Sequence, residues 1–167
     1  MDLFEAIEKR ASVRSFSPCD ITINELRQIV DAGHRAPSGC NYQPWEFIVV
    51  TDKNEVKELG QVQSCIGEAS AAIAVVADPD ASEYWKEDAS AAIENMLLAI
   101  TALGYASLWV EGYVFKNEAV ARKILNIPDD KTLLALLPVG RNREAAQADK
   151  KPLSEITHIN RYGEGSL

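Results

Sequence analysis

Apolar residues recur at helical spacing early in the chain. Ile23, Leu26 and Ile29 form one stripe, and Thr22 with Glu25 before it matches a capping box. The pattern therefore predicts a helix here, which ends before the proline that follows the stripe. A shorter helix is predicted over residues 3–10, after a possible N-cap aspartate at position 2.

Three more helices follow along the chain. Asp52 and Glu55 indicate a helix start that leads through residues 56–67. Residues 88–104 form the longest predicted helix, which is apolar over much of its circumference and so belongs in the core, with a glycine suited to its C-terminal end. Residues 116–126 are predicted as the last helix.

Short apolar runs between these helices predict strands. They are residues 46–52, 71–79, 105–112 and 132–140. Residues 11–19 are expected to be extended, and residues 141–167 are a polar tail without periodicity. Because helices and strands alternate without repeats, we expect one layered α/β or α+β domain over residues 1–167.

Composition narrows the possible partners. The formal net charge is −8, which argues against nucleic acid or an anionic membrane as a general partner. No apolar run is long enough to span a bilayer. Residues 1–10 are charged and lack the apolar core of a signal peptide, so we expect a cytoplasmic protein.

Cysteine and histidine do not indicate a disulfide framework or a metal site. Cys19, Cys40 and Cys65 are odd in number and widely spaced, so we expect reduced thiols. His34 and His158 lie far apart with no ligand spacing around them. The usual motifs of hydrolases, kinases and Rossmann dehydrogenases are also missing, so redox chemistry here would need an organic cofactor.

One candidate site is the segment KRASVRSF, residues 9–16. If it is extended, Ser12 and Arg14 point to one side and Val13 to the other. Together with Arg10, these side chains and nearby backbone N–H groups would suit a phosphate. The alternative is two solvated arginines, and the spacing alone leaves it open.

A second candidate is residues 35–47, RAPSGCNYQPWEF. Ser38, Asn41 and Gln43 stand between two prolines, and Gly39 permits close approach. Amide side chains donate and accept hydrogen bonds together, which suits the edge of a heterocycle. A turn whose side chains cap local backbone is an equal alternative.

Together the two segments resemble the nitroreductase family of flavoenzymes. Residues 88–112, DASAAIENMLLAITALGYASLWVEG, look like that family's central helix and following strand, and LLPVG with KKPLSEITH resembles its closing segment. The resemblance implies a three-layer α+β fold with a mixed, mainly antiparallel sheet flanked by helices. It also implies a homodimer with tightly bound FMN at the interface, in which residues 141–167 wrap the partner subunit.

The resemblance assigns a phosphate site. Arg10, Ser12 and Arg14 would hold the phosphate and ribityl chain of FMN. Lys150 or Lys151 falls where the family often places a further cation. The family also often has an arginine where this chain has alanine, next to Arg10, so one cation of the family's site is missing.

The resemblance places the flavin ring as well. Ser38, Asn41 and Gln43 would reach it from the other subunit, and Glu111 with Gly112 would lie near its reactive face. The chain is short for the family, so the insertion that often covers the active site is absent or reduced.

The implied activity is hydride transfer from NADH or NADPH through FMN to nitroaromatics, quinones or similar small acceptors, with no catalytic side chain assigned. Two alternatives stay open. One is a flavin-binding regulatory or storage protein with slow turnover, and the other is a specialised relative that destroys flavin or removes halogen.

Overall fold

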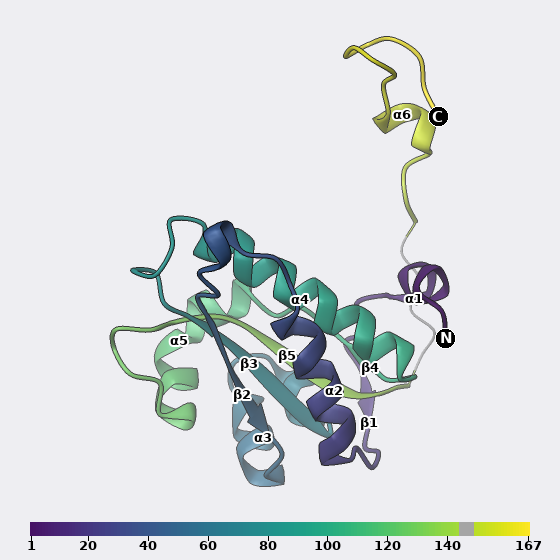
Figure 1. Ribbon diagram of the computed structural model, residues 1–167. Coiled ribbons are helices and arrows are strands. Elements are labelled where there is room, and N and C mark those ends of the chain that lie inside the picture. The colour runs from purple at the N-terminus through teal and green to yellow at the C-terminus, as the bar shows by residue number, and fades with distance from the viewer. Residues whose placement is uncertain (144–148) are drawn as a thin grey trace.

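A computed structural model describes residues 1–143 and 149–167 (Figure 1). Its strands form a single sheet of order β1-β5-β3-β2, in which β4 also pairs with β5. The strands are β1 (Phe16–Ser17), β2 (Trp45–Val50), β3 (Ala71–Ala77), β4 (Ala106–Ser107) and β5 (Thr132–Asn142). All four strand pairings are antiparallel, and a parallel bridge joins Ser12 to Ser107.

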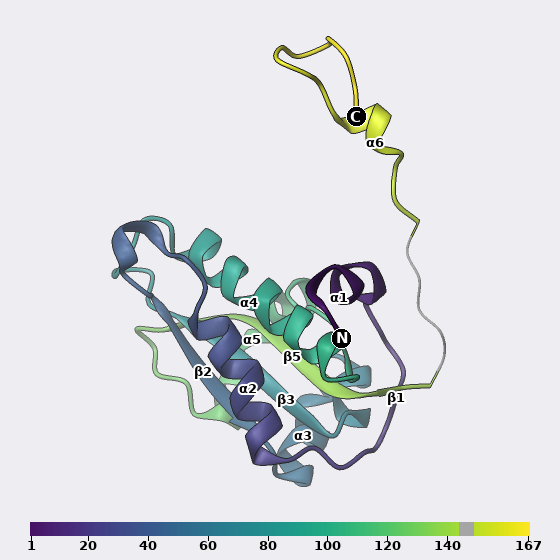
Figure 2. The same ribbon diagram turned by 45° about the vertical axis from the view of Figure 1, so that its right-hand side comes forward.

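Helices cover both faces of the sheet (Figures 1 and 2). One face packs against α2 (Ile23–His34) and α4 (Trp85–Ala102), and α1 (Leu3–Lys9) lies against α4. The other face packs against α3 (Lys53–Leu59), the 3-10 helix η2 (Ser64–Glu68) and α5 (Gly112–Leu125). The three-layer α+β fold is therefore confirmed.

The central strand β3 explains why the protein has two cores. Every residue of β3 is buried. Ala71, Ile73 and Val75 belong to the cluster under α2 and α4, whereas Ala72 and Ala74 belong to the cluster under α3 and α5. Alternate residues of a strand point to opposite faces, so an unbroken apolar run is what a strand covered on both faces requires.

The predicted helix ends are confirmed by their caps. The Asp2 carboxylate accepts a hydrogen bond from Glu5 N at 2.9 Å. Thr22 and Glu25 form both halves of the capping box at the start of α2. Gly104, just beyond α4, has φ +81°, a backbone conformation that other residues adopt only with strain.

The helix predicted through residues 56–67 was wrong in its second half. α3 ends at Leu59, and the chain turns back so that η2 packs against it. A Cβ at Gly60 would lie 3.2 Å from Gly67 Cα and 2.8 Å from Lys57 O. The two glycines thus let the backbones touch, and this contact replaces the expected helical continuation.

The strand predicted over residues 105–112 is also shorter than expected. Only Ala106 and Ser107 form a strand, Val110 adds an isolated bridge to Leu136, and α5 already begins at Gly112. Directly after the residues that pair with β4, β5 continues through Asn142, where it pairs with β1. The tail therefore starts two residues later than predicted.

The last part of the chain stands away from the body in both views of the ribbon (Figures 1 and 2). It contains the short helix α6 (Leu153–Ile156). Residues 144–148, which the tail prediction includes, lie outside the described residues. Among the described helices, none is long and apolar enough to cross a bilayer.

Candidate functional site

The first predicted site segment leaves α1 and runs beside β4. Val13 N donates to Ser107 O at 2.9 Å, and Ser12 forms the parallel bridge to the same residue. Val13 is buried, whereas Ser12 and Arg14 are exposed. The predicted alternation thus agrees with the structure, and backbone pairing fixes the segment on the edge of the sheet.

The two arginines of this segment differ in their partners. Arg10 Nε lies 3.7 Å from the carboxylate of Glu94 on α4. Within residues 1–143 and 149–167, no carboxylate forms an ion pair with Arg14. Arg14 therefore has its positive charge available for an external anion.

Arg14 also acts on a neighbouring thiol. Burial raises the pKa of Cys65 in η2, and the positive charge of Arg14 is one of the weaker effects that oppose this rise. Its guanidinium is thus close enough to η2 to influence that group. Cys19, Cys40 and Cys65 are not joined in disulfides among the described residues.

A buried hydroxyl without a partner lies next to this segment. Ser107 is only 5% exposed, and its Oγ has no hydrogen-bond partner among the described residues. Buried polar atoms are nearly always paired. A ligand carrying hydroxyl or phosphate oxygens beside Ser12 would suit this atom, so the donor set of the segment fits the ribityl phosphate of FMN.

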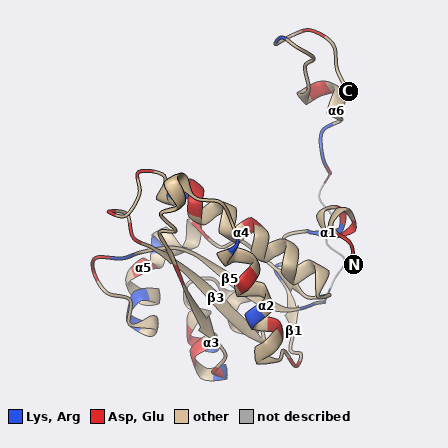
Figure 3. Ribbon diagram, viewed as in Figure 1, with Lys and Arg blue, Asp and Glu red and all other residues tan. Residues whose placement is uncertain are grey.

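The second predicted segment forms a loop with unusual backbone angles. It contains the 3-10 turn η1 (Gly39–Asn41), and φ is +48° at Cys40, +59° at Asn41 and +50° at Gln43. Positive φ is unfavourable for residues other than glycine, although asparagine tolerates it best. Within this segment, the loop of residues 38–43 has no Lys, Arg, Asp or Glu side chain (Figure 3).

Hydrogen bonds within the loop occupy two of the predicted side chains. Ser38 Oγ accepts from Gln43 N at 3.0 Å, and Gln43 Nε2 donates to Asn41 O at 3.3 Å. This is the local arrangement that the turn interpretation expects. The oxygen of the Gln43 amide and the side chain of Asn41 make no such bond within the described residues, so they are available to a ligand.

Sequence reasoning missed the residue that anchors this loop. Asp88 lies in the first turn of α4, where the helix dipole favours a carboxylate. It is also buried, and its carboxylate accepts from Gly39 N at 2.9 Å and from Ser82 Oγ at 3.2 Å. A signal was present, because Asp88 stands four and eight residues before Ala92 and Met96 on the buried stripe of α4.

The two predicted segments lie near opposite ends of α4 (Figures 1 and 2). Gly39 is bonded to Asp88 in the first turn, and Ser12 is paired with Ser107, just after the helix ends. A helix of 18 residues is about 27 Å long. A single chain therefore does not bring Ser12 together with the loop of residues 38–43.

Glu111 and Gly112 stand at the start of α5. Glu111 is the N-cap residue, but its side chain makes no capping hydrogen bond. A Cβ on Gly112 would meet no atom within 4 Å, so the space beside it is open. The first backbone N–H groups of a helix are donors without helical partners, and here they border open space.

Lys150 and Lys151 are exposed and lie in the tail, beyond the residues that are not described. Figure 1 shows this segment apart from the body of the same chain. Within one chain, the structure therefore does not place these lysines near Arg10 and Arg14.

The comparisons with known proteins agree with this geometry. The family model for the nitroreductase family matches residues 7–77 and 62–141, which together cover most of the chain. The chain belongs to the nitroreductase family. A relative from Archaeoglobus fulgidus, named "Putative NADH dehydrogenase/NAD(P)H nitroreductase", is 36% identical over 147 residues, which cover 83% of this chain and 84% of the relative.

Solved structures of nitroreductases have the same fold. An FMN-dependent nitroreductase from Clostridium difficile matches with a TM-score of 0.84 at 27% identity, covering 95% of this chain and 99% of that one. A protein from Desulfovibrio desulfuricans, solved in complex with FMN, matches with a TM-score of 0.85 at 25% identity, covering 97% and 98%. The predicted family is confirmed, and the predicted enzyme class, an NAD(P)H-dependent flavin oxidoreductase, agrees with these relatives.

Proposed function

We propose that this nitroreductase uses FMN to carry hydride equivalents from NADH or NADPH to small acceptors such as nitroaromatics or quinones. Its family and the FMN in its relatives support this activity. The observation that carries the proposal is the exposed Arg14, free of any carboxylate in the described chain, beside Ser12 and the partnerless hydroxyl of Ser107. Cation and hydroxyl donors on one fixed edge suit a phosphate with a polyol chain.

The residues between Ser107 and Gly112 extend this site toward a ring. From Ser107 to Val110 the chain runs beside β5 over three residues, about 10 Å, and Glu111 then leads into α5. A ligand whose phosphate lies at Arg14 would therefore have its other end near the start of α5. The uncapped N–H groups at Gly112 would then face the flavin. Arg10 is already paired with the carboxylate of Glu94, so it would contribute less than Arg14 to holding the phosphate.

The loop of residues 38–43 would complete the site of a second copy of the chain. It lies at the far end of α4 from the phosphate site of its own chain, which supports a homodimer with FMN at the interface. Asn41 and Gln43 would then place donors and acceptors along the polar edge of the flavin. The tail, with Lys150 or Lys151, would reach across to the same partner.

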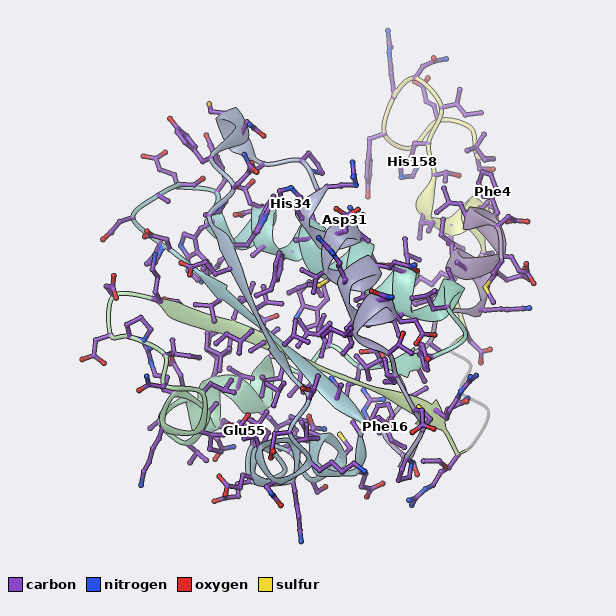
Figure 4. The ribbon with its side chains drawn as sticks, turned by 60° about the horizontal axis from the view of Figure 1, so that its bottom comes forward. Phe4, Phe16, Asp31, His34, Glu55 and His158 are labelled. Carbon is purple, nitrogen blue, oxygen red and sulfur yellow. The ribbon has the colours of Figure 1, made fainter. Side chains whose placement is uncertain are left out.

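The exposed apolar surface around α1 is suited to contact with a second copy of the chain. Leu3, Phe4 and Ile7 on α1 are exposed, and Figure 4 shows Phe4 at the outer edge of the molecule while Phe16 lies inside it. Beside α1, an apolar groove of about 350 Å³ opens between α1, α2 and α4. Apolar patches of this kind mark protein interfaces.

The chemistry would rest on the cofactor and not on a side-chain nucleophile. FMN held by Arg14, Ser12 and the loop of residues 38–43 would supply the chemistry of hydride transfer between a nicotinamide and the acceptor. The side chains of this chain would orient the reactants and supply hydrogen bonds, while the apolar walls from Val110 and Val114 would support the site from beneath. No residue of the chain is assigned as a proton donor.

Replacing Arg14 by alanine tests the phosphate site. FMN binding should weaken by about 2–3 kcal/mol, which is roughly 30- to 150-fold, because a charge-assisted contact is lost. Riboflavin, which lacks the phosphate, should bind the variant and the wild type equally, as measured by quenching of flavin fluorescence. Arg27→Ala, an exposed arginine on α2, serves as the matched control. If riboflavin binding falls as much as FMN binding, Arg14 supports the fold and not the phosphate.

A further inference from the structure

Asp88 is a buried carboxylate whose two oxygens both accept hydrogen bonds. It is 6% exposed, with Gly39 N at 2.9 Å on one oxygen and Ser82 Oγ at 3.2 Å on the other. Ser82 Oγ in turn accepts from Tyr84 N at 3.0 Å. Buried charges persist only where they are fully bonded, so this arrangement ties the loop at Gly39 and residues 82–84 to one side chain.

The loop of residues 38–43 needs such an anchor. Cys40, Asn41 and Gln43 all have positive φ, and each such residue stores strain that the surroundings must hold in place. The bonds within the loop join its residues only to each other. They fix the shape of the loop but not its direction relative to α4.

Within residues 38–43 two contacts give the loop that direction, while the flanking Ala36 and Trp45 pack with Ala92 of α4. One is the bond from Gly39 N to Asp88. The other is the packing of Gly39 on the ring of Tyr84, so close that a Cβ at position 39 would lie 2.7 Å from Tyr84 Cδ2. Both partners belong to the segment that starts α4, and the Ser82 hydroxyl joins them. The anchor is therefore built from Asp88 and residues 82–84.

We propose that Asp88 is a positioning residue for the flavin site: its carboxylate holds Gly39 and so fixes the direction in which Ser38, Asn41 and Gln43 face the flavin. This inference rests on the proposed function. Asp88 does not itself touch the flavin in this account. It acts at the start of α4, on the loop that a second copy of the chain would receive.

Aspartate is better suited here than asparagine. Asp88 accepts hydrogen bonds with both oxygens, and the Ser82 hydroxyl donates to one of them while it accepts from Tyr84 N. An amide would offer one acceptor and one donor, so either Gly39 N or the Ser82 hydroxyl would lose its acceptor. Asp88→Asn should therefore remove one of the two hydrogen bonds, whereas Asp88→Ala removes both.

The test compares Asp88→Asn and Asp88→Ala with Glu87→Ala, the exposed carboxylate one residue earlier, as control. FMN and riboflavin binding should weaken together, roughly 10- to 100-fold in Asp88→Ala and less in Asp88→Asn, because the ring contacts are lost and the phosphate contacts are kept. The visible spectrum of bound FMN should shift in the aspartate variants and stay unchanged in the control.

A second measurement needs no flavin. Hydrogen exchange of the Gly39 amide in the apoprotein should accelerate in both aspartate variants, since this N–H is bonded to Asp88. If Asp88→Ala is too unstable to study, Asp88→Asn and Ser82→Ala give the same comparison. Wild-type affinity and an unchanged spectrum in Asp88→Asn and Asp88→Ala would overturn the positioning role alone. A wild-type protein that binds no FMN would overturn the proposed function and this inference together, whatever the exchange rates are.

Discussion

At the scale of single residues, Gln43 shows how one side chain can satisfy two interpretations. Its amide nitrogen bonds Asn41 O at 3.3 Å, near the long limit for such a bond. Its amide oxygen remains free for a donor on a ligand. A bond this long can be exchanged for a contact between Gln43 and the flavin, so the turn and the flavin contact are compatible.

Gln43→Leu separates the two interpretations. If the amide nitrogen donates to the polar edge of the flavin, which gains electron density on reduction, the variant should have a lower reduction potential of bound FMN. A two-electron couple shifts by about 30 mV for each 1.4 kcal/mol, so a loss of about 1–3 kcal/mol corresponds to roughly 20–60 mV. The potential is measured against dyes of known potential.

Gln28→Leu, an exposed glutamine on α2, is the control for the added apolar surface. An unchanged potential together with a lower melting temperature of the apoprotein would mean that Gln43 is only a structural part of the turn.

Local signals in the sequence were sufficient where one short segment decides the structure. The caps at Asp2 and Thr22 and the glycine after α4 were predicted because their partners lie within a few residues. The contact between Gly60 and Gly67 and the bond from Gly39 to Asp88 were not predicted, because their geometry depends on tertiary packing. The segments of the proposed flavin site were suggested by family resemblance, and the anchor of the loop required the structure.

At the scale of elements, one hydrogen bond joins the start of α2 to the end of α4. Tyr105 OH donates to Glu25 Oε1 at 2.9 Å, so the capping-box glutamate also receives a bond from outside its helix. The hydroxyl of Thr22 chiefly lowers the pKa of Glu25, followed by the Thr22 N–H and then by Tyr105 OH. The glutamate is therefore held as an anion by two elements at once.

The bond between Tyr105 and Glu25 predicts that the stability of the folded protein depends on pH. Because the pKa of Glu25 is lower in the folded protein, its contribution to stability is present above the ordinary carboxyl value of 4.5 and is lost as the pH falls through the folded-state pKa. Tyr105→Phe removes one of the bonds that lower this pKa. The variant should therefore have a lower melting temperature than wild type at pH 7, with a smaller difference in acid.

Melting curves of wild type and Tyr105→Phe across pH 3–7 measure the effect, with Tyr113→Phe, an exposed tyrosine on α5, as control. An equal loss at both ends of this range would show that the Tyr105 hydroxyl stabilises the fold through its bond to Asp20 O, at 3.3 Å, and not through Glu25.

At the scale of the whole molecule, the apolar surface is distributed in a way that a single copy does not explain. Leu3 and Phe4 are exposed on α1, with Phe4 81% exposed, and the tail adds Leu153, Ile156 and Tyr162. Obligate dimers often have no stable folded monomer, and their exposed apolar residues are covered by the second copy. The alternation of elements was readable from the sequence, whereas this surface needed the three-dimensional arrangement.

We expect a dimer in solution at micromolar concentration. Phe4→Glu should raise the monomer fraction in sedimentation velocity and weaken FMN binding in parallel, because it places a charge on the α1 surface. Ala119→Glu, on the exposed face of α5, is the matched control and should leave both unchanged. A wild-type monomer that is folded and loaded with FMN would contradict the dimer and the flavin site divided between two copies.

The central claim is that this chain transfers hydride through a bound flavin. The most direct measurement loads the protein with FMN, adds NADH or NADPH without oxygen, and follows the visible absorbance of the flavin. The account predicts rapid bleaching with at least one of the two donors, and return of the colour when a quinone or nitroaromatic is added. Oxidised flavin that persists with both donors would contradict it and favour a flavin-binding protein without this activity.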